Sequence, residues 1–424
     1  MHTDSEPPAA KSSADPKPSH ALDSGKPTVA VVGGGASAHV LLPLLAESGH
    51  AVRLLTRRPR TWSPTIDLEL QSMDGEVIRS FAGSPETISD EPAEVISGAD
   101  VVVLCMPVSK YRIALHQVAP HLDRDREVFV GTVYGQAGFN WMTGEIERKF
   151  DLGSISTFSV GLIPWICRVL DYLRRRVTPG ATHVPLAALS RRSRVAALER
   201  GSVGSICGPE VGTGDFRQAD SFLSLTLSVD NQIIHPARCY GLFQRYGGRW
   251  ETAEDIPYFY RDFDELSASV LAAIDDEYSE VRGAIRARFP ERGFEHMLDY
   301  LALERFAHRS GNTDIRESFT TSESLAAIKP PTRQRADGSW EIDTDHRFFT
   351  DDIAYGLCIA KWMAQELGVE TPQIDAIVGW VGELRGERYI EGGRLLVEEA
   401  RMTEGFRSGI PPAYGIETID GIVD

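Results

Sequence analysis

Two segments far apart in the chain carry side chains that could move a proton. His235 lies in an apolar stretch at 233–237, while Arg347 precedes two adjacent carboxylates, Asp351 and Asp352, just before a predicted helix. Carboxylates placed there are favoured by the helix dipole. If His235 met Asp352 in the fold, the carboxylate would orient the ring and raise its basicity, giving a proton donor near neutral pH. A histidine on an apolar background is more often a buried core residue, so the pair is a hypothesis about the fold.

A second kind of chemistry is indicated near the N-terminus, where glycines separate a strand from a helix. An apolar stretch at 28–32 runs into Gly33-Gly34-Gly35-Ala36-Ser37-Ala38, and a helical pattern follows at 39–48. In the pattern G-x-G-x-x-A, Gly33 makes the tight turn, Gly35 lets a pyrophosphate approach, and Ala38 packs the helix on the strand. The turn continues through Ala36 to a helix N-terminus that favours phosphate. With a further strand at 51–55, this predicts dinucleotide binding rather than a plain structural turn.

The end of the strand at 51–55 bears on the choice of cofactor. An acidic residue there would accept hydrogen bonds from the ribose hydroxyls of NAD. This chain instead has Arg57 and Arg58, and no carboxylate before Asp67. Arginine offers bidentate donors and a permanent charge, which suit a ribose 2′-phosphate. The sequence therefore favours NADP(H) over NAD(H), and the alternative is a solvated basic loop.

Two later strands bring more candidates to the same edge of the predicted sheet. An apolar run at 101–107 ends in Met106 and Pro107, which we expect to line the nicotinamide side, because ligands collect outside the carboxyl ends of parallel strands. A strand at 127–132 leads to a turn that contains Gln136. Gln136 is a candidate for the site, and the alternative is that its side chain only caps its own turn.

Composition and charge narrow the class of protein. The 424 residues, 42% of them hydrophobic, predict two domains with filled cores. The formal net charge of -17 argues against nucleic acid and anionic membranes as partners. Five cysteines without metal-ligand spacing predict reduced thiols and no metal site. Residues 1–26 read as a disordered leader without a secretory signal, and no apolar run could span a membrane. We expect a cytoplasmic protein.

The pattern changes from alternating strands and helices to helices at about residue 206. One apolar stripe at helical spacing comprises Leu266, Val270, Ile274, Tyr278, Val281 and Ile285. Helical patterns recur at 356–367 and 373–384, and the polar, proline-containing segment 329–339 reads as an exposed loop. The predicted fold class is α/β, with a Rossmann domain at 27–205 followed by an all-helical domain at 206–424.

At these residues the chain resembles the octopine/nopaline (opine) dehydrogenase family, from about Lys26 to the end. The resemblance is carried by Gly-Gly-Gly-Ala-Ser-Ala-His at 33–39, Ser-Gly-Ala-Asp at 97–100, Gly-Gln-Ala-Gly-Phe at 135–139, Pro-Trp-Ile-Cys-Arg at 164–168, Ile-His-Pro-Ala at 234–237 and Arg-Phe-Phe-Thr-Asp-Asp at 347–352. It implies a catalytic dyad of His235 and Asp352 in a cleft between the two domains. It also implies that Arg347 binds a substrate carboxylate, that Gln136 borders the cleft, and that Cys167 lines the amino-acid side.

Two departures from the family pattern stand out. The family usually has Asp-x-Pro where this chain has Asp352-Ile353-Ala354, which could loosen the start of a helix there. The octopine type carries an acidic residue ahead of the Pro-Trp motif, whereas Ser159-Val160-Gly161 is neutral. The second departure argues against arginine as the amino donor.

The activity implied by the resemblance is NAD(P)H-dependent condensation of an amino acid with a 2-oxo acid, with reduction of the imine to an N-(carboxyalkyl)amino acid. The expected partners are these small substrates, and the expected state is a monomer or homodimer. One alternative is an oxidoreductase that reduces the C=O of an oxo acid without an amine. Another is a nucleotide-binding sensor without catalysis, against which the presence of His235, Arg347 and Asp352 counts.

Overall fold

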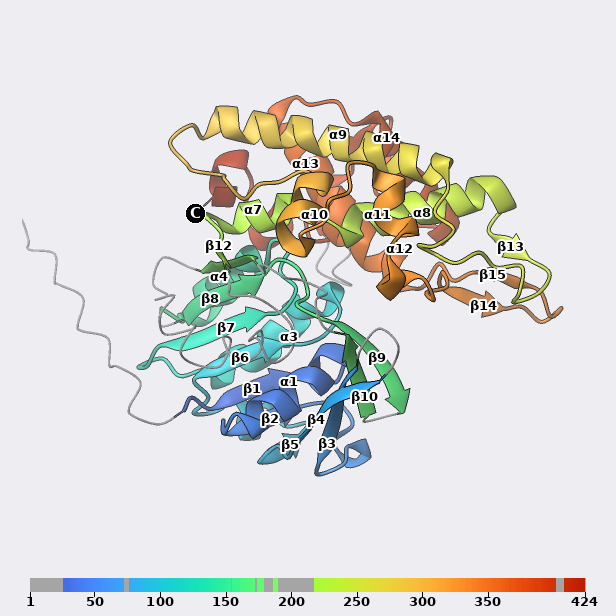
Figure 1. Cartoon of the computed structure of the whole chain (residues 1–424). Coiled ribbons are helices and arrows are strands. Elements are labelled where there is room, and N and C mark those ends of the chain that lie inside the picture. The colour runs from blue at the N-terminus through green and yellow to red at the C-terminus, as the bar shows by residue number, and fades with distance from the viewer. Residues whose placement is uncertain are drawn as a thin grey trace, which may run out of the picture.

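One large twisted sheet forms the N-terminal half of the molecule (Figure 1). The computed structural model describes residues 26–71, 76–153, 155–171, 174–178, 186–189, 217–401 and 408–423. The strand order is β12-β11-β8-β7-β6-β1-β2-β5. The strands are β1 Val29–Val32, β2 Val52–Leu55, β5 Thr87–Ser89, β6 Val101–Leu104, β7 Val128–Thr132, β8 Ile155–Val160, β11 Leu186–Leu189 and β12 Arg217–Gln218. Those from β5 to β8 pair in parallel in the order of a dinucleotide-binding fold, which confirms the predicted fold class.

The central strands of this sheet are apolar because both of its faces are covered. Every residue of β1 and β6 is buried, as expected for parallel strands between two layers. On one face lies α1 (Ala36–Glu47), and on the other lie α2 (Pro92–Ile96), α3 (Tyr111–Val118) and α4 (Phe139–Phe150), whose apolar side chains join separate clusters. The sheet therefore presents the carboxyl ends of its strands as a rigid edge.

A smaller sheet that we did not predict covers the outer side of α1. Its order is β4-β3-β10-β9, with β3 Ile66–Gln71, β4 Val77–Gly83, β9 Ile166–Asp171 and β10 Arg174–Thr178. Leu41 of α1 shares a core with Ile66 and Phe81 of this sheet. The first helix of the βαβ unit is thus held between two sheets.

Helices make up most of the second half (Figure 1). They are α7 Phe222–Leu227, α8 Asn231–Tyr246, α9 Glu265–Arg288, α10 Tyr300–His308, α11 Ile315–Thr320, α12 Arg347–Asp352, α13 Cys358–Leu367, α14 Pro372–Arg385 and α15 Val397–Arg401. The long helix α9 begins at Asp264, whose carboxylate accepts a hydrogen bond from the Ser267 N–H. Its predicted apolar stripe is buried except for Leu266, which is 43% exposed in the first turn of α9.

Two small antiparallel sheets interrupt the helices and correct part of the predicted loop at 329–339. β14 (Thr332–Gln334) pairs with β15 (Trp340–Ile342), which also pairs with β13 (Arg249–Trp250). A second pair joins β16 (Ile390–Glu391) and β17 (Arg394–Leu395). β14 contains only polar residues and buries none of them, so backbone pairing forms this strand without an apolar signal in the sequence.

The two halves share one core and several hydrogen bonds. One cluster of buried side chains includes Val32 and Val130 of the large sheet together with Leu271 and Trp362 of the helices. The Trp141 indole N–H donates to the Ile422 carbonyl at 3.2 Å. The leader, apart from Lys26, and the predicted boundary near 206 lie outside the described residues. Within the described ranges, every helix is too short or too polar to cross a membrane.

Candidate active site

The glycine-rich turn after β1 has the geometry of a phosphate cradle. Gly33 has a φ of +106°, and a Cβ there would lie 2.6 Å from the Cys105 carbonyl oxygen. A Cβ on Gly35 would lie 3.2 Å from the same oxygen. Helix α1 begins at Ala36, three residues earlier than predicted, and its first turn has no side-chain cap and no acidic residue. The turn therefore fits a pyrophosphate on both steric and electrostatic grounds.

The other predicted cofactor residues surround this cradle in different ways. Ala38 is fully buried against the sheet. Met106 and Pro107 follow β6 and line the pocket described below. Arg57 and Arg58 follow β2, are exposed to solvent, and do not line that pocket. They come directly after Thr56, whose hydroxyl would lie 3.3 Å from a Cβ on Gly34.

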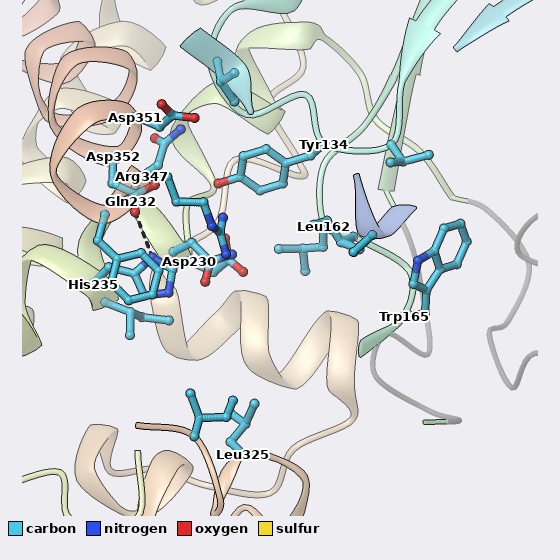
Figure 2. Close-up of a pocket in the computed structure, with 18 of the residues that line it drawn as sticks. Tyr134, Leu162, Trp165, Asp230, Gln232, His235, Leu325, Arg347, Asp351 and Asp352 are labelled. Atoms are coloured by element: carbon cyan, nitrogen blue, oxygen red, sulfur yellow. Dashed lines mark hydrogen bonds and ion pairs between the residues drawn. The ribbon is translucent and has the colours of Figure 1, made fainter. Parts of the chain in front are cut away.

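A pocket of about 750 Å³ opens between the sheet edge and the helices. Gly35, Ala36 and Ser37 of the cradle line one part of it. Figure 2 shows Tyr134, Leu162 and Trp165 on one side, and Asp230, His235, Arg347 and Asp352 gathered on the other. The pocket thus brings the cradle and the proton-transfer candidates into one cavity.

His235 and Asp352 meet in this pocket. His235 Nδ1 lies 2.8 Å from Asp352 Oδ2, and their side chains are 2% and 6% exposed. The Phe348 ring stacks on the imidazole with 3.5 Å between ring centroids. Nε2 lies 3.3 Å from the Tyr260 hydroxyl. Stacking and two hydrogen bonds fix the ring, with Nδ1–H donating to the carboxylate and Nε2 left as an acceptor.

Burial decides the charge of this pair. It lowers the pKa of His235 well below its usual value, and the positive charges of Arg347 and His346 act in the same direction. Burial also raises the pKa of Asp352 well above its usual value, against the opposite effect of Arg347. The imidazole is therefore neutral at neutral pH. This corrects the expectation of a ring with raised basicity, because burial first of all, and then the neighbouring Arg347, lower the pKa of His235.

Arg347 and Asp352 are the first and last residues of one short helix, α12. The expected arrangement, in which the carboxylates precede a helix, is wrong, because α12 runs directly into a π-helical turn at Ile353–Leu357 and then into α13. The backbone stays helical from α12 through Ile353 into α13, so there is no separate helix N-terminus at the position where the family has a proline. The Arg347 guanidinium makes no hydrogen bond or ion pair with any residue in the described part of the chain, which leaves its donors available to a ligand.

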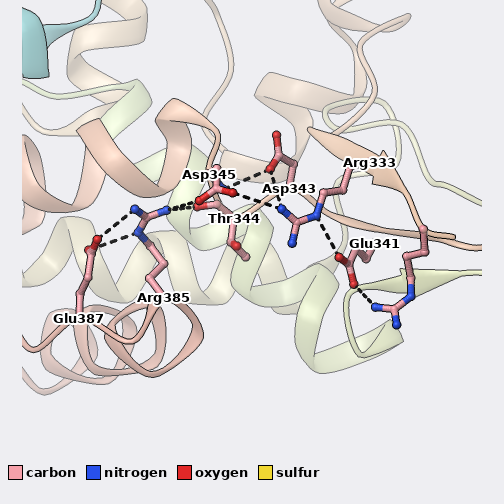
Figure 3. Close-up of polar contacts among 8 residues, drawn as sticks. Arg333, Glu341, Asp343, Thr344, Asp345, Arg385 and Glu387 are labelled. Atoms are coloured by element: carbon pink, nitrogen blue, oxygen red, sulfur yellow. Dashed lines mark hydrogen bonds and ion pairs between the residues drawn. The ribbon is translucent and has the colours of Figure 1, made fainter.

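Ion pairs hold the turn that leads into α12 (Figure 3). Arg385 donates to the Thr344 carbonyl and, at 3.3 Å, to Asp345. Glu387 accepts from the same guanidinium at 3.0 Å. On the other side, Arg333 of β14 donates to Asp345 at 3.2 Å. The hairpin and α14 together therefore fix where α12 begins.

Gln136 does not line the pocket itself but forms a hydrogen bond with Tyr134, which does. Its side chain is buried, its amide NH₂ donates to the Ser228 carbonyl at 3.0 Å, and its amide oxygen accepts from the Tyr134 hydroxyl at 3.0 Å. It neither caps its own turn nor lines the pocket, and it positions Tyr134, which does line it. Cys167 lies in β9, with its backbone opposite Val177, and its side chain lies outside the described residues.

Tyr134, Asp230, Tyr260 and Glu304 are among the polar residues that line the pocket and were not predicted as site residues from the sequence. Asp230 stands five residues before His235 at the start of α8, and its position before a helix was the one available signal. Tyr260 and Glu304 come from other segments, and no spacing in the sequence links them to His235.

Comparison with known proteins agrees with this geometry. Residues 218–385 match the family described as NAD/NADP octopine/nopaline dehydrogenase, alpha-helical domain. The chain is 28% identical to octopine dehydrogenase of Pecten maximus, over 93% of this chain and 98% of that protein. It is 25% identical to opine dehydrogenase of Haliotis discus hannai, over 94% and 99%. A solved structure of octopine dehydrogenase with NADH and L-arginine superposes with a TM-score of 0.77 at 26% identity, over 93% and 98%.

The matched residues contain His235, Arg347 and Asp352, and the structural likeness extends through the cradle to the sheet. The chain is therefore similar to octopine and opine dehydrogenases over almost its whole length, and its residues 218–385 match the helical domain of that family.

Proposed function

We propose that the chain is an opine-type dehydrogenase that joins the amine of an amino acid to a 2-oxo acid and reduces the resulting imine with NAD(P)H. The observation that carries the proposal is a hydrogen-bonded His235–Asp352 pair in the same pocket as a free Arg347 and a phosphate cradle. Relatives named octopine and opine dehydrogenase support it. Each turnover would take up one proton and release one water.

Arg347 is the residue for the oxo acid. Its guanidinium reaches the pocket without a carboxylate partner among the described residues. A guanidinium binds a carboxylate through two parallel hydrogen bonds, which fixes the orientation of the plane as well as the position. Such a clamp would hold the oxo acid with its carbonyl carbon in a defined place, which converts an encounter into an oriented reaction.

His235 is the residue for proton transfer. Its neutral ring has an acceptor at Nε2, next to the Tyr260 hydroxyl, and a fixed donor to Asp352 at Nδ1. When Nε2 takes a proton, the Asp352 carboxylate stabilises the imidazolium in a site that excludes water. A positioned acid-base group of this kind contributes about 10²- to 10⁴-fold to rate.

The cradle residues fit a nicotinamide dinucleotide. The backbone N–H groups at the start of α1 would hold the pyrophosphate, and Met106 and Pro107 would lie against the nicotinamide side. When bound, this cofactor supplies the hydride that reduces the imine. The surrounding residues bind it, orient it and keep water away.

One assay matrix tests the proposal. Purified protein is given NADPH or NADH, each common amino acid, and pyruvate, glyoxylate or 2-oxoglutarate, and cofactor oxidation is followed by absorbance. We expect oxidation only when amine and oxo acid are both present, and His235→Ala should lower kcat by at least about 100-fold. Oxidation with the oxo acid alone would instead identify a C=O reductase, and cofactor binding without turnover would identify a sensor.

The preference for NADP(H) rests on Arg57 and Arg58, which are exposed after β2 next to the cradle. A 2′-phosphate would gain charge-assisted hydrogen bonds there, worth about 1.5–3 kcal/mol each. We expect Arg58→Asp to raise KM for NADPH at least about 10-fold and to leave KM for NADH equal or lower. Arg60→Asp, also exposed but two residues farther along the chain from the end of β2, is the control. Equal effects of Arg58→Asp on both cofactors would contradict the preference.

A further inference from the structure

We infer that Asp230 and Glu304 form the subsite for the protonated amine of the amino donor, and that Glu304 removes one proton from it before the imine forms. The inference rests on the proposed function and adds to it the residues that recognise and activate the amine. Neither residue is needed for the dyad, the cofactor cradle or the oxo acid clamp.

Asp230 presents a carboxylate oxygen with nothing to bind it. The residue is the N-cap of α8, but its side chain accepts no capping hydrogen bond. Its Oδ1 is buried and has no hydrogen-bond partner in the described part of the protein. Figure 2 shows this carboxylate on the same side of the pocket as His235 and Arg347. A buried acceptor without a donor is costly, and a ligand that donates to it would remove that cost.

Glu304 faces the same cavity from α10. The Nε2 atom of His308, one turn later in the same helix, lies 3.7 Å from Glu304 Oε1. Burial, together with the negative charge of Asp230, raises the pKa of Glu304 to about 7. The titratable groups that act on it are Asp230 from the start of α8, and Tyr300 and His308 from α10 itself. The two carboxylates thus repel each other in a buried place.

The charges of the lining residues favour a cationic ligand beside Asp230 and Glu304. Among the lining residues that the structure describes there are four carboxylates, one arginine and no lysine. Asp352 is bound to His235, and Asp351 accepts from the Thr350 hydroxyl. Among the described residues, Asp230 and Glu304 form no ion pair with an arginine or a lysine, and Glu304 approaches the His308 ring at 3.7 Å. A primary ammonium brings one positive charge and three donors, which match two carboxylates, whereas a carboxylate or phosphate would be repelled.

The proton step follows from the chemistry of an amine. An ammonium nitrogen has no free electron pair and cannot attack a carbonyl. When a Glu304 oxygen takes one proton, an N–H bond breaks, an O–H bond forms, and the electron pair stays on nitrogen to attack the oxo acid. A carboxyl that titrates near the working pH is matched to this exchange, because the bound amine cation favours its ionised form and it can then accept the proton from nitrogen. The proton then returns to solvent.

The test uses Glu304→Gln and Asp230→Asn in the full chain, with Glu295→Gln as control. Glu295 is exposed and does not line the pocket, so its variant makes the same chemical change elsewhere. We expect each pocket variant to raise KM for the amine at least about 10-fold, the loss of one charge-assisted hydrogen bond, with KM for oxo acid and cofactor within about twofold. In Glu304→Gln, kcat/KM for the amine should also lose its dependence on a group titrating near pH 7.

A measurement without turnover separates recognition from folding. Calorimetry of amine binding at pH 7 in two buffers of different ionisation enthalpy should show proton release by the wild type, because an arriving cation ionises Glu304, and none by Glu304→Gln. Glu304→Asp, which keeps the charge, should restore part of the amine affinity. Unchanged KM for the amine and unchanged proton release in the variants would overturn the inference. A wild type without amine-dependent turnover would overturn the proposed function instead.

Discussion

At the scale of single residues, the Asp352 carboxylate is buried, and burial disfavours its charged form. Asp352 is fully enclosed, and burial holds its pKa well above the usual value. Because the folded state then binds more protons than the unfolded state above pH 3.8, this group lowers the free energy of unfolding as pH rises from 3.8 toward the raised pKa. The protein keeps this costly residue beside His235, as expected for a group retained for function.

Replacing that carboxylate should separate stability from activity. Asp352→Asn keeps an acceptor for the His235 Nδ1–H and removes the buried charge, so we expect the variant to melt at the same or a higher Tm at pH 7.5. The Tm difference in favour of the variant should grow as pH rises above the usual pKa of aspartate, while kcat falls at least about 100-fold. Thermal unfolding and steady-state rates measure both. A lower Tm with full activity would contradict this account.

Site residues that belong to a motif within one short segment could be predicted from the sequence. Site residues that only tertiary packing brings together could not. The cradle was predicted from local spacing, whereas the meeting of His235 with Asp352, 117 residues apart, was a hypothesis that only the family resemblance supported. Tyr260 and Glu304 were missed because only the packing of separate segments brings them to the pocket. The pKa of His235 was expected to rise, but burial, which sequence does not report, lowers it.

At the scale of elements, the dyad depends on how closely α8 approaches the π-helical turn after α12. A Cβ on Gly356 in that turn would lie 2.9 Å from the Gln232 Cβ of α8. Gln232 also donates to the Tyr355 carbonyl at 3.3 Å. Short π-helical segments are frequent at functional sites. Here the turn lets two elements approach closely enough for one to carry the imidazole and the other the carboxylate.

Gly356→Ala should therefore impair the site, and Gly283→Ala provides a matched control. Gly283 lies in α9, and a Cβ there would meet nothing within 4 Å. We expect Gly283→Ala to raise the free energy of unfolding by about 0.5–1 kcal/mol with unchanged activity. Gly356→Ala should lower it by about 1–3 kcal/mol and reduce kcat at least about 10-fold. Chemical denaturation and kinetics give both values, and a fully active Gly356→Ala would show that the close approach is not needed.

Element prediction succeeded where packing leaves a pattern in the chain. The central strands are continuous apolar runs, and most of the α9 stripe is buried as expected. The hairpin of β14 and β15 was taken for a loop because its first strand has only polar residues. α12 was missed as a helix because it is six residues long, capped by His346, and too short for a periodic signal.

At the scale of the whole molecule, the protein has a formal net charge of -17. In the proposed function its pocket has to bind both an anionic oxo acid and a cationic amine. The field of the protein repels an anionic oxo acid and attracts a cationic amine, and salt screens both effects. We expect kcat/KM for the oxo acid to rise, and that for a basic amine to fall, between about 10 mM and about 150 mM salt, a range over which the screening length shortens from about 30 to about 8 Å. Identical salt responses for the two substrates would contradict this.

Arg347 and Asp352 begin and end the same six-residue helix, whereas Asp230 and Glu304 stand on α8 and α10. In the proposed function, the residue that binds the oxo acid and the residue that holds the imidazole therefore occupy one helix and would be conserved together in evolution. The residues inferred to recognise the amine belong to two other helices. Substitutions on those two helices could therefore change the preferred amino donor during evolution, while the residues that bind the oxo acid and transfer the proton stay the same.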